Sequence, residues 1–160
     1  MSALNPYASF LDGRPVLDVL AETPRAVRSL LESIGPGKSY EAPAPGKWSP
    51  GEIVAHLADC ELVFGFRLRQ TLAEDGPTIQ PFDQDNWAKT YKGVEPTEAC
   101  AAFSAFRKWN LILLEGALPA AADRTVTHPE RGAMTFQTIV ETMAGHDLNH
   151  LGQLQRIAGQ

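Results

Sequence analysis

The sequence predicts an all-α protein built as a four-helix bundle. Four long segments place apolar residues three and four positions apart, which is the period of a helix with one buried face. Helix-start residues precede these segments, Gly and Pro follow them, and no segment has the pattern of a convincing strand. Similar helix lengths and moderate loops are typical of a bundle. At 160 residues, we expect one domain covering residues 1–160.

The first predicted helix covers residues 15–34, and we expect Thr23 and Pro24 to interrupt it. The second has the clearest start: in Ser49-Pro50-Gly51-Glu52, Ser is an N-cap, Pro occupies the first turn and Glu completes a capping box. It is expected to stop near residues 75–77. The remaining predictions are a third helix at 97–118 and a fourth, capped by Thr135, that runs to about 158.

Two long connections separate these helices. Residues 77–95 carry Phe82, Trp87 and Tyr91, and a loop this long and aromatic in a compact protein is usually functional or partly helical. Residues 120–133 read as a polar connector, so we expect His128 in it to face solvent.

Composition and charge exclude several classes of partner. The net charge is −5 and no block of Lys or Arg is present, which argues against a nucleic-acid partner. No apolar run approaches the ~20 residues of a membrane span, and residues 1–10 lack the features of a secretory signal. Cys60 and Cys100 are far apart, which favours two reduced thiols. We therefore expect a cytoplasmic protein that acts on a small molecule, without a membrane partner.

Three histidines carry the strongest functional signal. His146 and His150 are one helical turn apart within the apolar stripe of the fourth helix, and His56 lies near the start of the second helix. Burying imidazoles without partners is costly, whereas one metal ion would satisfy them together. If the two helices face each other, three His ligands and an open coordination position suit Zn²⁺ or Ni²⁺. The alternative is that these histidines are structural and hydrogen-bond neighbouring helices.

Further residues are candidates for supporting roles. Ligating imidazoles usually donate their second N–H to a carboxylate or carbonyl, and the nearest carboxylates in sequence belong to Glu52, Asp59 and Asp147. Glu52 is better explained by its capping role, while Asp59 and Asp147 could equally be solvated. Cys60, one turn after His56, is most simply a small apolar core residue. The catalytic residues themselves stay unknown.

The chain resembles the DinB-like family of damage-inducible four-helix metalloproteins. Two segments carry the resemblance, KWSPGEIVAHL at residues 47–57 and GHDLNHLGQ at residues 145–153. Their combination and order are far more specific than either motif, and the resemblance extends over essentially the whole chain.

The resemblance implies a DinB/YfiT-like bundle with up-down-down-up topology and a divalent metal held by His56, His146 and His150. Several relatives are thiol-S-transferases or isomerases that use low-molecular-weight thiols, so thiol transfer is the leading expectation for this chain. A metal-dependent hydrolase and a non-catalytic metal- or ligand-binding stress-response protein are the alternatives, since the same ligands serve each. The resemblance also implies a homodimer, with the third helix, apolar over much of its circumference, as the candidate interface.

Overall fold

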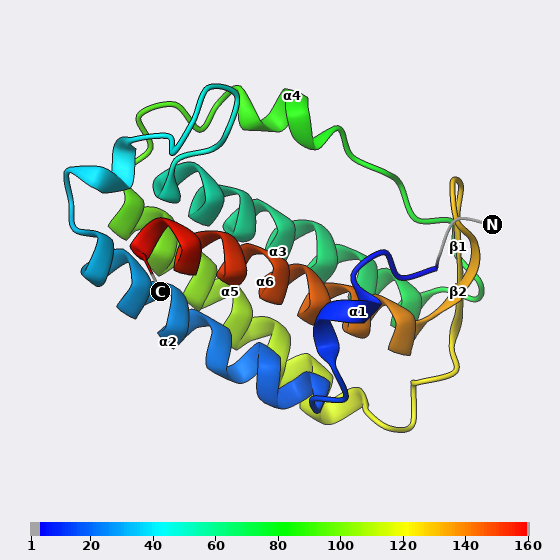
Figure 1. Cartoon of the computed structure of the whole chain (residues 1–160). Coiled ribbons are helices and arrows are strands. Elements are labelled where there is room, and N and C mark those ends of the chain that lie inside the picture. The colour runs from blue at the N-terminus through cyan, green and yellow to red at the C-terminus, as the bar shows by residue number, and fades with distance from the viewer. Residues whose placement is uncertain (1–3, 160) are drawn as a thin grey trace.

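Four long helices form the body of the protein (Figure 1). The computed structural model describes residues 4–159. Residues 1–3 and residue 160 lie outside the described part. Residues 1–3 belong to the stretch 1–10 for which no secretory signal is expected. The bundle consists of α2 (Val16–Ile34), α3 (Pro50–Ala73), α5 (Pro96–Ala117) and α6 (Phe136–Ala158). The predicted all-α fold class is confirmed.

The helices follow the expected up-down-down-up order. Figure 1 shows that α2 and α6 run in one direction and that α3 and α5 run in the other. The parallel helices pack in pairs, α2 against α6 and α3 against α5. Between the two pairs, α2 packs against α5 and α3 packs against α6. Because α3 and α6 are antiparallel neighbours, residues early in α3 lie beside residues in the second half of α6.

Pro24 does not interrupt the first long helix, contrary to the prediction. Helix α2 continues through it from Val16–Ile34. Proline cannot donate to the carbonyl four residues earlier, so the Leu20 carbonyl lacks its usual helical partner. The guanidinium of Arg107 supplies the missing hydrogen bond, with Nη1 2.8 Å from the Leu20 oxygen. A long-range contact thus keeps the helix continuous.

The predicted caps position the helices that carry the histidines. The Ser49 backbone N–H donates to Glu52 Oε2 over 2.7 Å, and Ser49 Oγ accepts from the Glu52 backbone N–H, which completes the capping box of α3. Thr135 Oγ1 accepts from the Thr138 backbone N–H at the start of α6. Both helix starts agree with the sequence analysis.

A β-hairpin replaces the polar connector expected between the last two long helices. Strands β1 (Thr125–His128) and β2 (Gly132–Thr135) pair antiparallel, with Val126 opposite Met134. These two side chains and His128 are buried, so the expectation of a solvent-facing His128 was wrong. The strands have four residues each, which is too short for an alternating pattern to stand out.

Three short elements cover the bundle: α1 (Ala8–Leu11), the 3₁₀ helix η1 (Lys38–Tyr40) and α4 (Gln84–Ala88). Helix α1 packs on α6, and the chain before it passes so close that a Cβ at Gly145 would lie 2.5 Å from the Tyr7 carbonyl oxygen. Glycine is therefore required where the N-terminal segment crosses α6.

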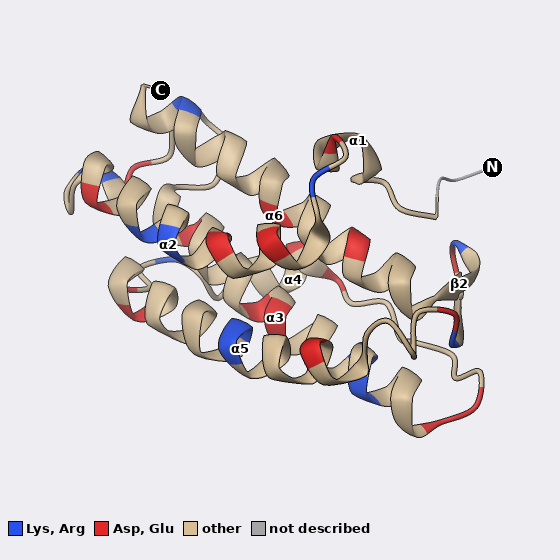
Figure 2. Cartoon of the chain, turned by 90° about the horizontal axis from the view of Figure 1, so that it is seen from below, with Lys and Arg blue, Asp and Glu red and all other residues tan. Residues whose placement is uncertain are grey.

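Charged residues are spread over the helices, as Figure 2 shows from below the bundle. In residues 4–159, no helix is both long and apolar enough to cross a membrane.

Candidate metal centre

The three predicted histidines converge at one point between α3 and α6. His56 Nε2 lies 3.0 Å from His146 Nε2, which lies 3.2 Å from His150 Nε2. All three side chains are buried, with exposed fractions of 1%, 5% and 5% in sequence order. A search of the described residues for three or more donor side chains close enough to hold one metal ion finds this group of histidines.

Burial keeps the three imidazoles neutral. Loss of solvent, together with a smaller effect of the nearby His150, lowers the pKa of His56 to about 3. Burial also lowers the pKa of His150 to about 4, and that of His146 falls well below its usual value. At neutral pH each ring therefore has a free nitrogen lone pair, which is the form that binds a metal.

Gln153 fixes the tautomer of His150. Its side-chain oxygen Oε1 lies 3.0 Å from His150 Nδ1, and a carboxamide oxygen can only accept, so this ring nitrogen carries the proton. The Nε2 lone pair of His150 must then point into the cluster. Metal-binding histidines are commonly oriented by such a partner. The sequence analysis missed Gln153, although its i+3 spacing from His150 on α6 was a usable signal.

Aromatic side chains enclose the cluster. The Trp48 ring lies 4.8 Å from that of His56, centroid to centroid, and is nearly parallel to that of His150 at 6.4 Å. Tyr7 contacts His146 edge-on, with ring centroids 5.3 Å apart. These contacts limit the access of water to the ring nitrogens and come from segments distant in the chain.

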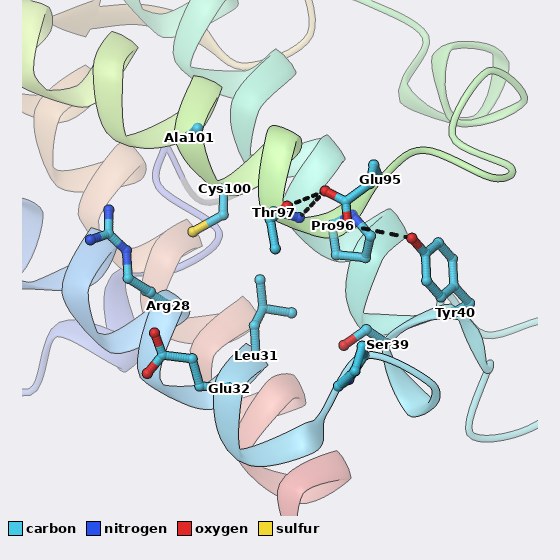
Figure 3. Close-up of a pocket in the computed structure, with 11 residues that line it drawn as sticks. Arg28, Leu31, Glu32, Ser39, Tyr40, Glu95, Pro96, Thr97, Cys100 and Ala101 are labelled. Carbon is cyan, nitrogen blue, oxygen red and sulfur yellow. Dashed lines mark hydrogen bonds between the residues drawn. The ribbon is translucent and has the colours of Figure 1, made fainter.

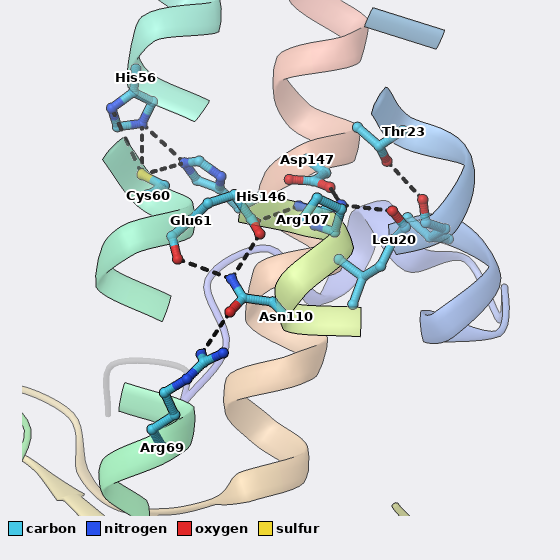
Figure 4. Close-up of polar contacts among 11 residues, drawn as sticks. Leu20, Thr23, His56, Cys60, Glu61, Arg69, Arg107, Asn110, His146 and Asp147 are labelled. Atoms are coloured by element: carbon cyan, nitrogen blue, oxygen red, sulfur yellow. Dashed lines mark hydrogen bonds and ion pairs between the residues drawn. The ribbon is translucent and has the colours of Figure 1, made fainter. Parts of the chain in front are cut away.

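Cys60 lies beside the cluster. Its Sγ is 3.5 Å from Nε2 and 3.8 Å from Nδ1 of His56, so the sulfur packs against that ring (Figure 4). Burial and the negative charges of Asp147, Glu61 and Asp59 raise the pKa of the thiol. It is therefore a protonated, buried group, in agreement with the simpler interpretation of the sequence.

The carboxylates predicted as supporting residues are engaged elsewhere. Glu52 accepts from Ser49 in the capping box, and Asp59 Oδ2 accepts from the Tyr91 hydroxyl at 2.8 Å. Asp147 is buried and its Oδ2 lies 2.7 Å from Arg107 Nη1. Among residues 4–159, none of these carboxylates has a hydrogen bond to a histidine of the cluster.

Arg107 forms a second buried polar centre that the sequence analysis did not predict (Figure 4). Its guanidinium contacts Glu61 of α3 at 2.6 Å, Asp147 of α6 and the Leu20 carbonyl of α2. Asn110 Nδ2 adds a 3.0 Å hydrogen bond to Glu61 Oε2. One side chain of α5 thereby joins all four long helices, and Asp147 connects this centre to the helix of His146.

A hollow of about 590 Å³ is lined by Trp48 and Gln153, which contact the histidines, but by none of the three histidines themselves. A separate pocket of about 400 Å³ lies between α2, η1 and α5, where Tyr40 and Cys100 line it (Figure 3). Burial raises the pKa of the Cys100 thiol. That pocket contains none of the predicted site residues.

Comparison with known families gives one clear match. The model of the DinB superfamily matches residues 20–154, a range that includes all three clustered histidines and most of the bundle.

Curated relatives and a solved structure extend this match. OB0782 of Oceanobacillus iheyensis, named provisionally as a metal-dependent hydrolase, is 25% identical over 139 residues, covering 86% of this chain and 81% of that protein. GK0616 of Geobacillus kaustophilus has the same kind of name and is 32% identical over 115 residues, covering 68% and 63%. YfiT from Bacillus subtilis, described as a probable metal-dependent hydrolase with an unusual four-helix bundle topology, superimposes with a TM-score of 0.79 at 23% identity, covering 90% and 86%.

Proposed function

The chain belongs to the DinB superfamily, and we propose that it is a metal-dependent hydrolase of small molecules whose ion is held by His56, His146 and His150. The observation that carries the proposal is the convergence of three buried histidines, each with a ring nitrogen within 4.8 Å of the others. The names of its relatives support hydrolysis over the thiol transfer expected from the sequence. Thiol transfer stays a prediction and forms one arm of the test.

The donor set fits a divalent ion. A tetrahedral ion with bonds of about 2.0–2.1 Å places its nitrogen ligands about 3.3 Å apart, close to the observed 3.0 and 3.2 Å. Three neutral imidazoles suit zinc and nickel, which we propose as the candidate metals. A tetrahedral ion with three protein ligands keeps one position for a substrate or water molecule.

A divalent ion at this position would supply a Lewis acid that polarises the substrate and makes water a nucleophile at neutral pH. The chain's own residues supply orientation and exclusion of water. Gln153 holds the His150 ring in one tautomer, while Trp48 and Tyr7 pack against the rings. The Cys60 sulfur, 3.5 Å from His56 Nε2, borders the same position.

A hydrolysis screen tests the proposal. Metal-free protein is loaded with Zn²⁺ or Ni²⁺ and assayed on ester and amide panels, with small thiols plus an electrophilic acceptor in parallel. We expect metal-dependent hydrolysis that His56→Ala removes and Cys100→Ser retains, with both variants folded by circular dichroism. Hydrolysis that persists in His56→Ala, or metal-dependent thiol transfer without hydrolysis, would contradict the proposal.

We also propose that the protein forms a homodimer through the outer face of α5. Trp109 and Ile112 are one turn apart on this helix and are 64% and 55% exposed. Light scattering of wild-type protein and Trp109→Glu tests this, and an unchanged mass in the variant would contradict it.

A further inference from the structure

The two helices that carry the histidines each present a pair of donor side chains one turn apart. On α6 the pair is His146 and His150, and on α3 it is His56 and Cys60. Residues four apart in a helix lie on the same face, one above the other. Because α3 and α6 pack against each other, the two pairs meet between the helices. The fourth member, which the proposed metal centre does not use, is a sulfur atom.

The Cys60 sulfur approaches two of the three ring nitrogens that would hold the ion. It lies 3.5 Å from His56 Nε2 and 3.8 Å from His146 Nε2 (Figure 4). With metal–nitrogen bonds of about 2.0–2.1 Å and a metal–sulfur bond of about 2.3 Å, a tetrahedral ion would place nitrogen and sulfur ligands about 3.6 Å apart. The observed separations lie on either side of that value, so one ion can bind the sulfur together with both nitrogens.

The sulfur is the outlying donor of the four. In the described part of the chain, the group whose donor atoms all lie within 4.8 Å of one another consists of the three histidines without Cys60. The sulfur therefore borders the ion position from the side of His56 and His146 and is farther from His150. Two ligands of one ion with these bond lengths lie at most about 4.4 Å apart, so the Cys60 or the His150 side chain shifts when both bind. The sulfur is accordingly the donor that an incoming group can replace while the histidines stay in place.

The two cysteines of the chain have different surroundings, although each has only 5% of its surface exposed. Cys60 contacts two imidazoles, whereas Cys100 lines the separate pocket on α5 together with Arg28 and Tyr40. Packing as a small apolar side chain explains a thiol such as Cys100. It does not explain a thiol whose sulfur meets two nitrogens, because the single thiol proton can be donated to only one of them.

A cation beside Cys60 would change the state of its thiol. In the metal-free protein, burial and the negative charges of nearby carboxylates raise the pKa of this group. A divalent ion at bonding distance reverses that effect, because a thiol that coordinates a metal loses its proton. The S–H bond breaks, the proton passes to water, and the sulfur donates an electron pair to the ion. When another ligand takes its place, the sulfur recovers a proton from water.

We propose that Cys60 is the fourth donor of the resting metal centre and that the substrate takes its place. With the sulfur bound, the ion has four protein ligands, which is the arrangement of a closed site. Displacement of the sulfur restores three histidines and one position for the substrate, as in a catalytic site. This inference rests on the proposed function, which supplies the ion and its three histidine ligands.

X-ray absorption at the zinc edge tests the ligand directly. Full-length wild-type protein loaded with one equivalent of zinc is compared with Cys60→Ala and with the matched control Cys100→Ala. In the wild type and the control, we expect one sulfur neighbour at about 2.3 Å beside nitrogen neighbours at about 2.0–2.1 Å, and in Cys60→Ala no sulfur neighbour. A wild type without a sulfur neighbour would overturn the inference and leave the three-histidine site standing.

Cobalt in place of zinc follows the displacement. A thiolate bound to Co²⁺ gives a charge-transfer band in the near ultraviolet, which the wild type should show and Cys60→Ala should lack. Acetohydroxamate, a small ligand with two oxygen donors, is then added, and its binding is followed by calorimetry. We expect the band to fall as the ligand saturates the protein. A band that persists at saturation would overturn the displacement of Cys60.

The zinc affinities of the variants give the size of the effect. Replacing a residue that only orients a metal ligand weakens binding about 10–100-fold, so Cys60→Ala should lose at least about tenfold while Cys100→Ala binds as wild type. Equal affinity in both variants would contradict a fourth ligand. If Cys60→Ala does not fold, the wild-type spectra decide the question. A sulfur neighbour in a protein that hydrolyses nothing would contradict the proposed function and leave Cys60 a ligand.

Discussion

Two buried polar centres of the same bundle differ in how their charges are balanced. In the Arg107 centre, a guanidinium lies between two carboxylates and a backbone carbonyl, so opposite charges meet within the protein. In the histidine cluster, three neutral rings point their Nε2 atoms at one another. An N–H at Nε2 of His146 can donate to the Nε2 of His56 or of His150, but not fully to both. The Nδ1 of His146 is buried without a partner in residues 4–159.

The difference distinguishes buried polar groups that hold the fold together from buried polar groups that could bind a ligand. A network of paired charges holds helices in register, although Arg107 Nε has no hydrogen-bond partner in residues 4–159. A cluster of converging lone pairs has no such opposite charge within the described part of the protein, and a cation would complete it. Asp147 and His146 are adjacent on α6, so the first centre also fixes the helix that carries the second. The following predictions test this division, from the largest expected effect to the smallest.

Replacing Arg107 with Met should destabilise the fold most. The change leaves Glu61 and Asp147 buried without a cation, which costs about 3–5 kcal/mol of unfolding free energy. Urea unfolding measures the loss, with the exposed Arg25→Met expected within about 0.5 kcal/mol of wild type. Equal stability of both variants would show that the network does not hold the bundle together.

Adding zinc or nickel should stabilise the protein through the histidines alone. At a free metal concentration 100 times Kd, we expect about 2.7 kcal/mol of added stability. The double variant His146→Ala/His150→Ala should show none of it, while His128→Ala, which removes a buried histidine outside the cluster, should show all of it. Thermal unfolding with and without metal gives both results, and stabilisation of the double variant would place the metal elsewhere.

Gly145→Ala should disturb the N-terminal cover of the cluster. The new Cβ would lie 2.5 Å from the Tyr7 carbonyl oxygen, and such overpacking costs about 1–3 kcal/mol. Gly152→Ala on the same helix is the matched control, because its Cβ would meet Arg156 Nη1 at 3.5 Å and should stabilise α6 slightly. If both variants melt alike, the N-terminal segment does not depend on this contact.

Acid should weaken the metal-free fold through the cluster. The pKa of His150 is about 4 in the folded protein and about 6.5 when unfolded, so below pH 6.5 the unfolded chain takes up the proton first and stability falls. Between pH 6.5 and 5.5 this costs about 1 kcal/mol per histidine. Burial raises the pKa of Glu61 and Asp147, which opposes the trend, so the wild type is compared with His150→Ala. A pH-independent difference between the two would contradict the account.

Local signals explain why so much of the fold was predictable. The capping box at Ser49 and the pair His146 and His150 each depend on residues only one turn apart in the sequence. The structure has both where expected. The convergence of His56 with the other two followed from placing α3 against α6.

The features that were missed depend on contacts between distant segments. Arg107 resembles any polar residue of a helix until Glu61, Asp147 and Leu20 are brought to it from three other helices. The same contact explains the continuity of α2 through Pro24. His128 is buried because it lies in the hairpin that packs on the bundle. Strands of four residues are too short for the sequence pattern to predict that hairpin.

Metal content tests the central claim most directly. Untagged wild-type protein and the His146→Ala/His150→Ala variant are purified together, shown to be equally folded by circular dichroism, and analysed by mass spectrometry. The account predicts close to one equivalent of zinc or nickel per chain in the wild type and almost none in the variant. A wild type that holds no metal and binds neither added ion, or a variant that retains it, would contradict the claim that the three histidines form a metal centre.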